Sequence, residues 1–331
     1  VDKLFCYINF FLYIYTMKES KISNVFTFGV KEPKEGDVKV SYFQYTMYAN
    51  CPHQWKLNYM DGNRSFDPSI HLVFGTAMHE TLQSWLDTLY NKSIEDASKI
   101  DLGKMLYECM LVEYKKMREQ TGVEFSNASQ MEEFLEDGIA ILNEVTKNRV
   151  DYFNTRHMNL VAIELPIYQK AMESHNVYMR GFLDLVFEDT YENKLQIWDI
   201  KTSTMGWNKW QKADKTKTAQ LVLYKKFLSE QFGYPLDRIS TKYFIVKRKL
   251  TEGMMFAQKR VQTFEPANGK PTLNKITKSF EDFVRNSFNE DGSHRRDSEF
   301  PAMAGKNGKN CKWCPFKNDE EACPKGNRHK V

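Results

Sequence analysis

Apolar residues in the first half of the chain recur at the spacing of a helix face. Between Leu72 and Tyr90 they follow a period of three to four residues, which predicts an amphipathic helix with His79 beside its apolar stripe. Similar patterns lie near 101–119 and 129–152. Residues 41–60 predict two short helical pieces broken at a Cys-Pro step, because proline disfavours helix in the residue before it. The first half should therefore be mainly helical.

The pattern changes near residue 160, where short β-branched and aromatic runs alternate with polar turns, as in a strand meander. Helices are then expected at about 214–232 and 272–288. This order predicts an α/β fold in which helices flank a mixed β-sheet core and the helical first half packs around it. The strand patterns cover 161–170, 176–189, 194–203, 241–249 and 256–264.

The chain divides into four expected segments. Residues 1–16 are apolar and aromatic, but the run is too short for a bilayer-spanning helix and lacks a signal-peptide cleavage site. We expect them to be a non-native or disordered extension upstream of Met17. Residues 17–155 should form the mainly helical part, 156–290 the sheet-containing core, and 291–331 a cysteine-rich tail.

The composition changes this picture little. With 41% hydrophobic and 27% charged residues, the chain has the make-up of a soluble globular protein. Its 47 basic and 43 acidic residues nearly balance, so any surface that binds nucleic acid must be local. Without a recognisable export signal we expect a cytoplasmic protein, in the host cytoplasm for a viral source, with no membrane attachment.

The strongest chemical signal is a pair of carboxylates with a lysine. Asp184 lies in one strand pattern, and Asp199 and Lys201 lie in the next, where residues two apart project to the same side. A surface ion pair would be the ordinary alternative. However, Trp198 and Ile200 flank Asp199 with apolar bulk, which predicts a buried acid that needs a partner or a metal. Such a site suits hydrolysis of phosphodiesters with a divalent cation.

A third element follows on the next helix, where Gln220 and Tyr224 lie one turn apart. The order GxxD, DxK and QxxxY resembles the RecB-like branch of the PD-(D/E)XK nucleases over residues 41–324. The resemblance implies a restriction-endonuclease-like core and a substrate-organising role for Gln220 and Tyr224. It also brings Glu164 to the site, although this residue reads equally well as an exposed strand position.

The same resemblance implies the metal ligands. Asp184 and Asp199 would bind Mg²⁺ or Mn²⁺, and the carbonyl group of Ile200 would complete the shell. Lys201 would position the attacking water or stabilise the negative charge of the transition state. His79 matches the family's upstream histidine ligand, whereas alone it would read as an ordinary histidine at a helix surface.

Four cysteines form a second candidate metal site. Six cysteines without an export signal argue against a disulfide framework, and thiolates suit soft metals or iron-sulfur clusters. One cysteine before the core and three after it is similar to iron-sulfur nucleases, including CRISPR-associated exonucleases and certain helicase-nuclease subunits. This likeness implies a [4Fe-4S] cluster, while a structural Zn²⁺ site remains an alternative. Cys6 and Cys109 are expected to be uninvolved. The four proposed ligands are Cys51, Cys311, Cys314 and Cys323.

A basic and aromatic stretch after the DxK strand is the candidate DNA surface. Cations neutralise phosphates and indoles stack on unpaired bases, which suits single strands or frayed ends. A charge run is usually a solvated face, but this one leaves directly from the carboxylate strand. Lys247, Arg248 and Lys249 are a weaker second candidate. The residues of the first stretch are Trp207, Lys209, Trp210, Lys212, Lys215 and Lys217.

Together these features predict a metal-dependent DNA nuclease, an exonuclease acting in recombination, repair or replication. Its partner would be DNA that is single-stranded or has free ends. No G-x-x-x-x-G-K-[ST] motif is present, so a helicase or recombination protein is a further expected partner. The alternative is a non-catalytic subunit that binds DNA ends or has a structural role, which the intact set of charged residues disfavours.

Overall fold

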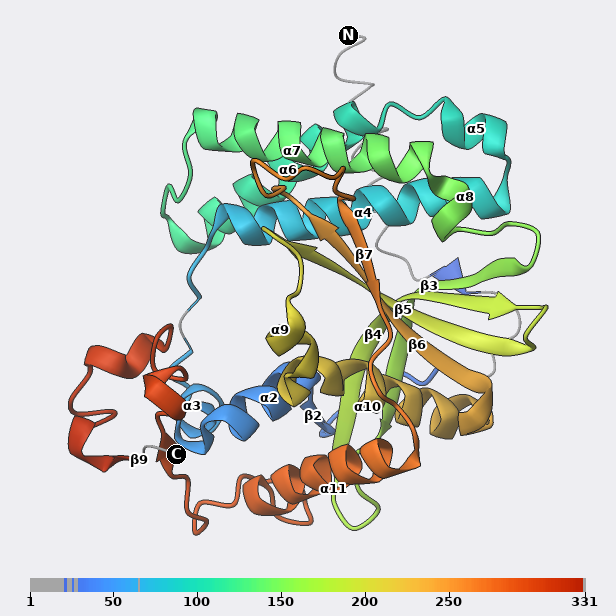
Figure 1. Ribbon diagram of the computed structural model, residues 1–331. Helices are drawn as coiled ribbons and strands as arrows, with labels where there is room; N and C mark the ends of the chain where they lie inside the picture. The colour runs from blue at the N-terminus through green and yellow to red at the C-terminus, as the bar shows by residue number, and fades with distance from the viewer. Residues whose placement is uncertain (1–20, 23–25, 27–28, 65, 330–331) are drawn as a thin grey trace, which may run out of the picture.

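The computed structural model describes residues 21–22, 26, 29–64 and 66–329, so the expected extension 1–16 lies outside the described part. A mixed sheet forms its centre (Figure 1), with strand order β1-β3-β4-β5-β6-β7 and β2 paired with β4. The expected mixed sheet is thus confirmed. The strands are β1 (Lys21–Ile22), β2 (Val38–Val40), β3 (Met158–Lys170), β4 (Val177–Asp189), β5 (Lys194–Ser203), β6 (Ile239–Lys247) and β7 (Val261–Phe264).

Strands β3, β4 and β5 form an antiparallel meander, whereas β6 runs parallel to β5 and β7 antiparallel to β6. A parallel neighbour requires a crossover, and the helices between β5 and β6 supply it. These are α9 (Lys209–Ala213) and α10 (Lys215–Phe232). The crossover lays α10 against the sheet next to the end of β5 that bears the predicted site.

Helices cover both faces of the sheet (Figure 1). On one face, α4 packs with α6 and α7 over an apolar core that contains Trp198 and Ile200 of β5. On the other face, α10 packs with α2 and α11 over a core that contains Leu195 and Ile197. Successive side chains of β5 point to opposite faces of the sheet, so this strand contributes residues to both apolar cores. These helices are α2 (Tyr42–Asn50), α4 (Ile70–Asn91), α6 (Leu102–Thr121), α7 (Ala128–Lys147) and α11 (Lys270–Ser287).

Several predicted boundaries shift for local reasons. The helix expected over 129–152 divides at Asn148 into α7 and the short α8 (Arg149–Tyr152). The strand expected over 256–264 begins only at Val261, because its partner β6 ends at Lys247 and the preceding residues lie in an exposed loop. None of the helices in the described residues has both the length and the apolar character that a bilayer crossing requires.

The tail returns to the helical segment near Cys51. The predicted break at that residue separates α2 from α3 (Pro52–Trp55), which continues as a π-helical turn, Lys56–Met60. A small apolar cluster joins Leu57 of this turn to Phe316 in the tail. The other described elements are α5 (Ile94–Ser98), β8 (Ala302–Met303), β9 (Arg328–His329) and 3-10 turns at Leu236–Arg238, Lys306–Gly308, Pro315–Asn318 and Lys325–Asn327.

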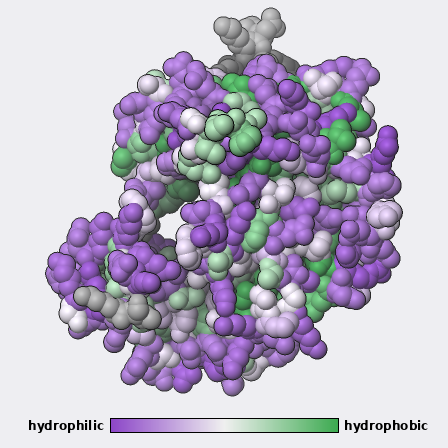
Figure 2. All heavy atoms as spheres, viewed as in Figure 1, coloured by the Kyte–Doolittle hydropathy of each residue, from purple (hydrophilic) through white to green (hydrophobic). Residues whose placement is uncertain are grey.

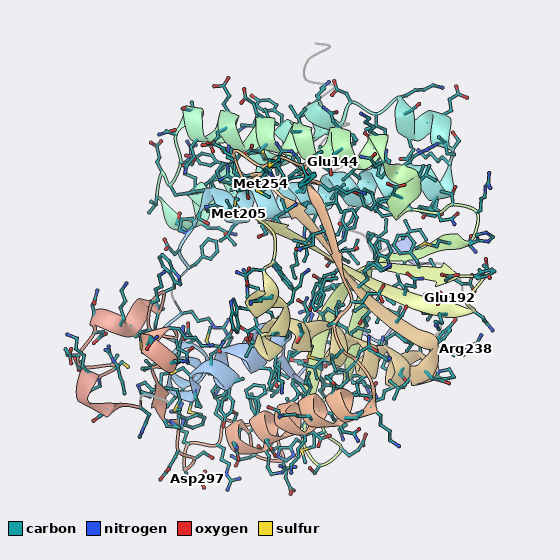
Figure 3. The ribbon with its side chains drawn as sticks, in the orientation of Figure 1. Glu144, Glu192, Met205, Arg238, Met254 and Asp297 are labelled. Carbon is teal, nitrogen blue, oxygen red and sulfur yellow. The ribbon has the colours of Figure 1, made fainter. Side chains whose placement is uncertain are left out.

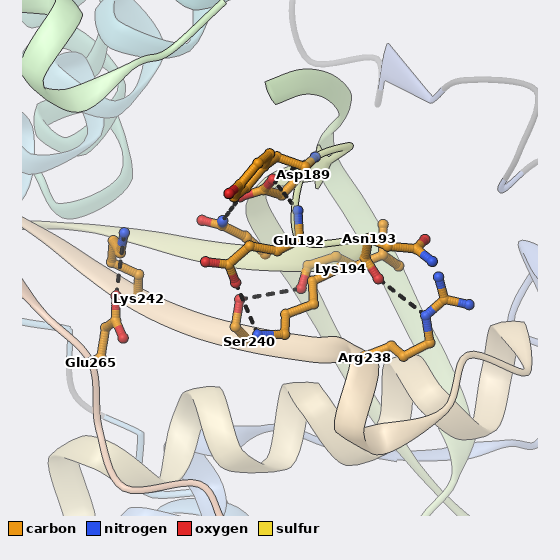
Figure 4. Close-up of polar contacts among 11 residues, drawn as sticks. Asp189, Glu192, Asn193, Lys194, Arg238, Ser240, Lys242 and Glu265 are labelled. Atoms are coloured by element: carbon orange, nitrogen blue, oxygen red, sulfur yellow. Dashed lines mark hydrogen bonds and ion pairs between the residues drawn. The ribbon is translucent and has the colours of Figure 1, made fainter. Parts of the chain in front are cut away.

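The two ends of β5 differ. At one end the β4–β5 turn is closed by polar contacts (Figure 4), including a hydrogen bond of 3.1 Å from Arg238 Nε to the carbonyl oxygen of Asn193. Asn193, in the turn between β4 and β5, has a positive φ of 54°. Figure 3 labels Glu192 at this end and Met205 at the opposite end. There, Figure 2 shows an opening between the tail and the rest of the molecule.

Candidate active site

The antiparallel register of β4 and β5 brings the two predicted carboxylates together. Leu185 pairs with Trp198, so Asp184 and Asp199 are the next residues along the same ladder. The backbone N–H of Ile200 donates a hydrogen bond of 2.8 Å to Asp184 Oδ2. Two acidic residues fifteen positions apart in sequence therefore meet at one point of the sheet.

Asp199 is a buried acid whose ion-pair partner among the described residues is Lys201. Its exposed fraction is 2%, and Lys201 Nζ lies 2.8 Å from its Oδ2. Within the described residues, neither carboxylate oxygen accepts a hydrogen bond of ordinary geometry. The contact with Lys201 is therefore an ion pair without good hydrogen-bond angles. Unsatisfied buried oxygens are costly, and a bound cation would satisfy them.

Burial dominates the electrostatics of the pair. It raises the pKa of Asp199 to about 6 and that of Asp184 to about 6, while the Lys201 ammonium group opposes both shifts. Burial also opposes the charge on Lys201, but Asp199 and Asp184 raise the pKa of this lysine above its usual value. Two carboxylates with one ammonium group leave excess negative charge, which a divalent cation would neutralise.

His79 reaches the carboxylates from α4. Its Nδ1 lies 3.4 Å from Asp184 Oδ2, and burial together with Lys201 lowers the pKa of the imidazole to about 4. A neutral imidazole can bind a metal. As the side chains stand, no three His, Cys, Asp or Glu residues in the described part surround a single ion position. Mg²⁺ needs no such cage, because it keeps several waters and binds through one or two carboxylates.

Glu164 belongs to the same site. The register of β3 and β4 sets it across from Asp184, and its φ of 51° is one of the few positive values at a non-glycine residue in the described chain. Such backbone strain is concentrated at functional sites. Burial, reinforced by the charge of Asp184, raises the pKa of Glu164 to about 7.

The sequence interpretation missed Gln83. Its Nε2 lies 2.6 Å from Glu164 Oε1 and also donates to the carbonyl oxygen of Asp184 at 3.2 Å. Gln83 follows His79 by one helical turn, so both side chains leave the same face of α4. That spacing was the signal that could have identified it.

Gln220 and Tyr224 line the other side of the same pocket, from α10. Gln220 Nε2 lies 3.5 Å from the Tyr224 hydroxyl group, at the limit of a hydrogen bond. A Cβ atom on Gly181 would approach the Tyr224 ring to 2.8 Å, so only glycine lets the ring lie against β4. The close packing of Tyr224 therefore explains why the GxxD motif has a glycine at position 181.

The candidate DNA stretch divides into buried and exposed parts. Trp207 is 8% exposed and packs against Tyr243 at a centroid distance of 4.8 Å, so its indole is not available for base stacking. Our prediction of a stacking role is corrected for this residue. Trp210 is exposed, with Lys209 5.0 Å from its ring centroid. The remaining lysines of the stretch, Lys212, Lys215 and Lys217, are on α9 and α10.

The weaker basic candidate is largely neutralised by acidic partners. Arg248 Nη1 lies 2.9 Å from Glu133 and 2.7 Å from Asp137, and its guanidinium group lies over the Phe134 ring. Lys249 contacts the same two acids. These contacts join α7 to the end of β6 and give Arg248 a structural role.

The four predicted cysteines line one common cavity between α3 and the tail. Burial raises the pKa of the Cys51 and Cys314 thiols, and neighbouring cysteines add to both shifts, as expected for thiols that lie close together. The backbone N–H of Met303 donates to Cys51 Sγ at 3.3 Å. Cys109 is buried elsewhere, in the core under α4 and α6, and Cys6 lies outside the described residues.

Comparison with known proteins completes the description. The sequence description of the PD-(D/E)XK nuclease superfamily matches residues 39–323. No curated protein matches the chain. Among solved structures, a protein from Eubacterium rectale named "Putative exonuclease" is similar at 10% identity, with a TM-score of 0.43, covering 77% of this chain and 86% of its own.

Proposed function

Because the chain belongs to the PD-(D/E)XK nuclease superfamily, we propose that it is an exonuclease of the RecB-like branch, hydrolysing DNA from free ends. The superfamily hydrolyses phosphodiester bonds and generally uses Mg²⁺ or Mn²⁺. One observation carries the proposal of activity: Asp184 and Asp199 directly follow the last pair of β4 and β5, Leu185 with Trp198, and the Lys201 ammonium group lies 2.8 Å from Asp199. An intact acidic pair with its lysine disfavours a non-catalytic subunit.

The residues of the candidate site would each have a separate role in hydrolysis. Asp184, Asp199 and the Ile200 carbonyl oxygen would hold the cation, and neutral His79 would add a nitrogen ligand. The cation supplies an activated water and neutralises developing charge. Lys201 holds a proton at Nζ beside Asp199, where its positive charge would orient the water and stabilise the negative charge that develops on the phosphoryl oxygens.

Substrate positioning would come from the surrounding helices and loops. Gln220 and Tyr224 line the pocket opposite His79, and exposed Trp210 with its neighbouring lysines would contact the DNA strand outside the pocket. Such contacts are electrostatic and aromatic, so they favour single strands or frayed ends. Exonuclease action in recombination, repair or replication, beside a separate helicase or recombination protein, is part of this proposal.

For the cysteine cavity we propose a [4Fe-4S] cluster. Four thiols line the cavity, and burial raises the pKa of two of them, Cys51 and Cys314, whose thiolate form bound iron would stabilise. The cluster would link α3 to the tail, so the free energy of cluster binding would contribute to the stability of the folded protein. Zn²⁺ is the alternative occupant, and metal analysis separates the two.

The nuclease proposal is tested with end-labelled linear DNA and covalently closed circular DNA in the presence of Mg²⁺. We expect degradation of linear DNA only, and a loss of roughly 100-fold or more in Asp199→Asn, as for removal of a transition-state-stabilising group. Equal rates for wild type and Asp199→Asn would refute the catalytic assignment. Cleavage of circular DNA would refute the exonuclease assignment alone.

A further inference from the structure

The mouth of the active-site pocket carries aromatic side chains that the sequence interpretation did not consider. The pocket that contains His79, Asp184 and Lys201 is also lined by Phe43 of α2 and Phe182 of β4. Phe43 is 69% exposed and Phe182 is 40% exposed. Large exposed apolar residues beside a charged pocket are typical of a binding surface.

The register of β4 fixes the distance between Phe182 and the reaction centre. Met179 and Leu183 are buried in the core under α10, so the intervening Arg180 and Phe182 project from the opposite face. Phe182 precedes Asp184 by two residues, roughly 6 to 7 Å along a strand. This separation is similar to one nucleotide step of an extended strand.

Phe43 is held at the pocket by its helix. Ser41 caps the start of α2, and the hydroxyl group of Tyr42 donates to the carbonyl oxygens of Thr216 and Lys217 at the start of α10. These bonds anchor the first turn of α2 to the helix that carries Gln220 and Tyr224. The Phe43 ring therefore projects from a fixed position instead of from a loop.

The charge of the mouth selects the occupant. Lys39 and Arg180 line the same pocket as the two rings, and the Arg180 guanidinium carbon lies 5.8 Å from the Phe182 ring centroid. Aromatic faces with neighbouring cations fit unpaired bases joined by phosphates. A paired duplex hides its base faces and could not use the rings.

We propose that Phe43 and Phe182 form a stacking subsite for unpaired bases of the strand whose phosphate reaches Asp184 and Asp199, while Lys39 and Arg180 contact its backbone. This inference rests on the proposed nuclease function and names its substrate as single-stranded nucleic acid at the cleavage point. The subsite adds two aromatic side chains at the pocket to the discrimination against duplex that Trp210 would supply outside it.

The test measures binding without hydrolysis. Two kinds of dye-labelled oligomer are compared: oligothymidylate, and matched oligomers that carry abasic sites at one end or the other. Each is titrated with wild type, Phe43→Ala, Phe182→Ala and the double variant, in EDTA so that no hydrolysis occurs. Wild type should bind the base-bearing oligomer roughly 5- to 150-fold more tightly per stacked base. The double variant should lose the part of this preference that Phe43 and Phe182 supply and keep only the part that comes from exposed Trp210. Measuring each protein variant with each oligomer gives a double-mutant cycle, which separates the loss of base stacking from a general loss of affinity.

Two controls separate stacking from folding. Tyr191→Ala removes an aromatic residue that is more exposed than Phe43 or Phe182 from the turn at the far end of β5, and it should retain the preference. Phe182→Tyr keeps an aromatic ring and should also retain the preference. Phe182→Leu keeps the apolar bulk without a ring and should lose the part of the preference that the Phe182 ring supplies. Thermal melting of every variant shows whether it is folded.

The outcomes distinguish this inference from the nuclease proposal, because hydrolysis by wild type is assayed in parallel with Mg²⁺. An unchanged base preference in the folded double variant, with a wild type that cleaves, would overturn the subsite and leave the nuclease intact. If the double variant loses the preference but wild type does not cleave DNA with Mg²⁺, the result would support the subsite and overturn the nuclease proposal. A wild type indifferent to base removal would also overturn the subsite.

Discussion

Gln83 Nε2 donates a hydrogen bond of 2.6 Å to Glu164 Oε1, linking α4 to β3 directly beside Asp184. The same amide donates to the carbonyl oxygen of Asp184. Gln83 is itself buried, so its donors have no ready access to water. One side chain thus positions the strained glutamate and the strand that carries a proposed metal ligand.

Replacing Gln83 with Leu should therefore lower both stability and activity. The partly buried carboxyl group of Glu164 loses its donor, at a cost of about 1 to 3 kcal/mol in the free energy of unfolding. Urea denaturation measures this cost, and we expect at least a tenfold slower hydrolysis. The double variant Gln83→Leu with Glu164→Leu should recover part of the stability but not the activity. Full activity in Gln83→Leu would contradict the positioning role.

Gly181→Ala should disturb Tyr224, because the new Cβ atom would lie 2.8 Å from its ring. Overpacking of this kind costs about 1 to 3 kcal/mol. Gly103→Ala is the matched control in a helix, since its Cβ atom would meet the flexible Ile139 side chain at 3.4 Å and Asp101 Oδ1 at 3.6 Å, without a close approach. That variant should be as stable as wild type or more stable by about 0.5 kcal/mol. Thermal unfolding that ranks the two variants in the reverse order would refute the argument.

Arg248→Ala should reduce stability more than DNA affinity. Its removal leaves the buried Asp137 with Lys249 as its one remaining ion-pair partner among the described residues, so we expect a loss of about 2 kcal/mol in the free energy of unfolding. Lys259→Ala, at an exposed lysine 3.8 Å from Asp151, should change it by less than about 0.5 kcal/mol. Normal stability with weakened DNA binding would restore Arg248 as a DNA contact.

Stabilisation by Mg²⁺ should depend on pH. Because the pKa values of Asp184 and Asp199 are raised to about 6, the folded metal-free protein binds more protons than the unfolded chain between about pH 4 and 6. These groups therefore cost stability as pH rises through this window. Metal binding needs ionised carboxylates and recovers the loss.

Melting temperatures with EDTA and with Mg²⁺, recorded from about pH 5 to about pH 8, measure this effect. The shift caused by Mg²⁺ should be small at the acid end and grow above about pH 6. Asp199→Asn should abolish most of it. A shift of equal size at both ends would mean that other groups bind the ion.

Cys314→Ser should give colourless and less stable protein after anaerobic purification, since Cys314 lines the cavity shared by the four cysteines. Cys109→Ala, at a buried thiol in another core, should keep its iron, sulfide and visible absorbance. A soluble Cys314→Ser protein with unchanged iron and sulfide would refute the cluster assignment. Wild-type protein that contains zinc without sulfide would identify the alternative.

The sequence by itself determined the fold class and the candidate chemistry on β4, β5 and α10. Alternation along a strand is local, so the spacing of Asp199 and Lys201 already placed both side chains on one face. The short polar gap between the strand patterns 176–189 and 194–203 was enough to suggest that Asp184 would lie on the neighbouring strand. Helical period likewise set Gln220 beside Tyr224.

Only the tertiary structure decided which distant segments meet. The pairing of Gln83 with Glu164, the burial of Trp207 under Tyr243 and the arrival of Phe43 at the pocket all depend on packing between elements remote in sequence. No local period encodes such contacts, because an amide, an indole or a phenyl ring has the same local pattern whether it faces solvent, a core or a substrate. Their roles follow from the register of the sheet and the faces that its helices cover.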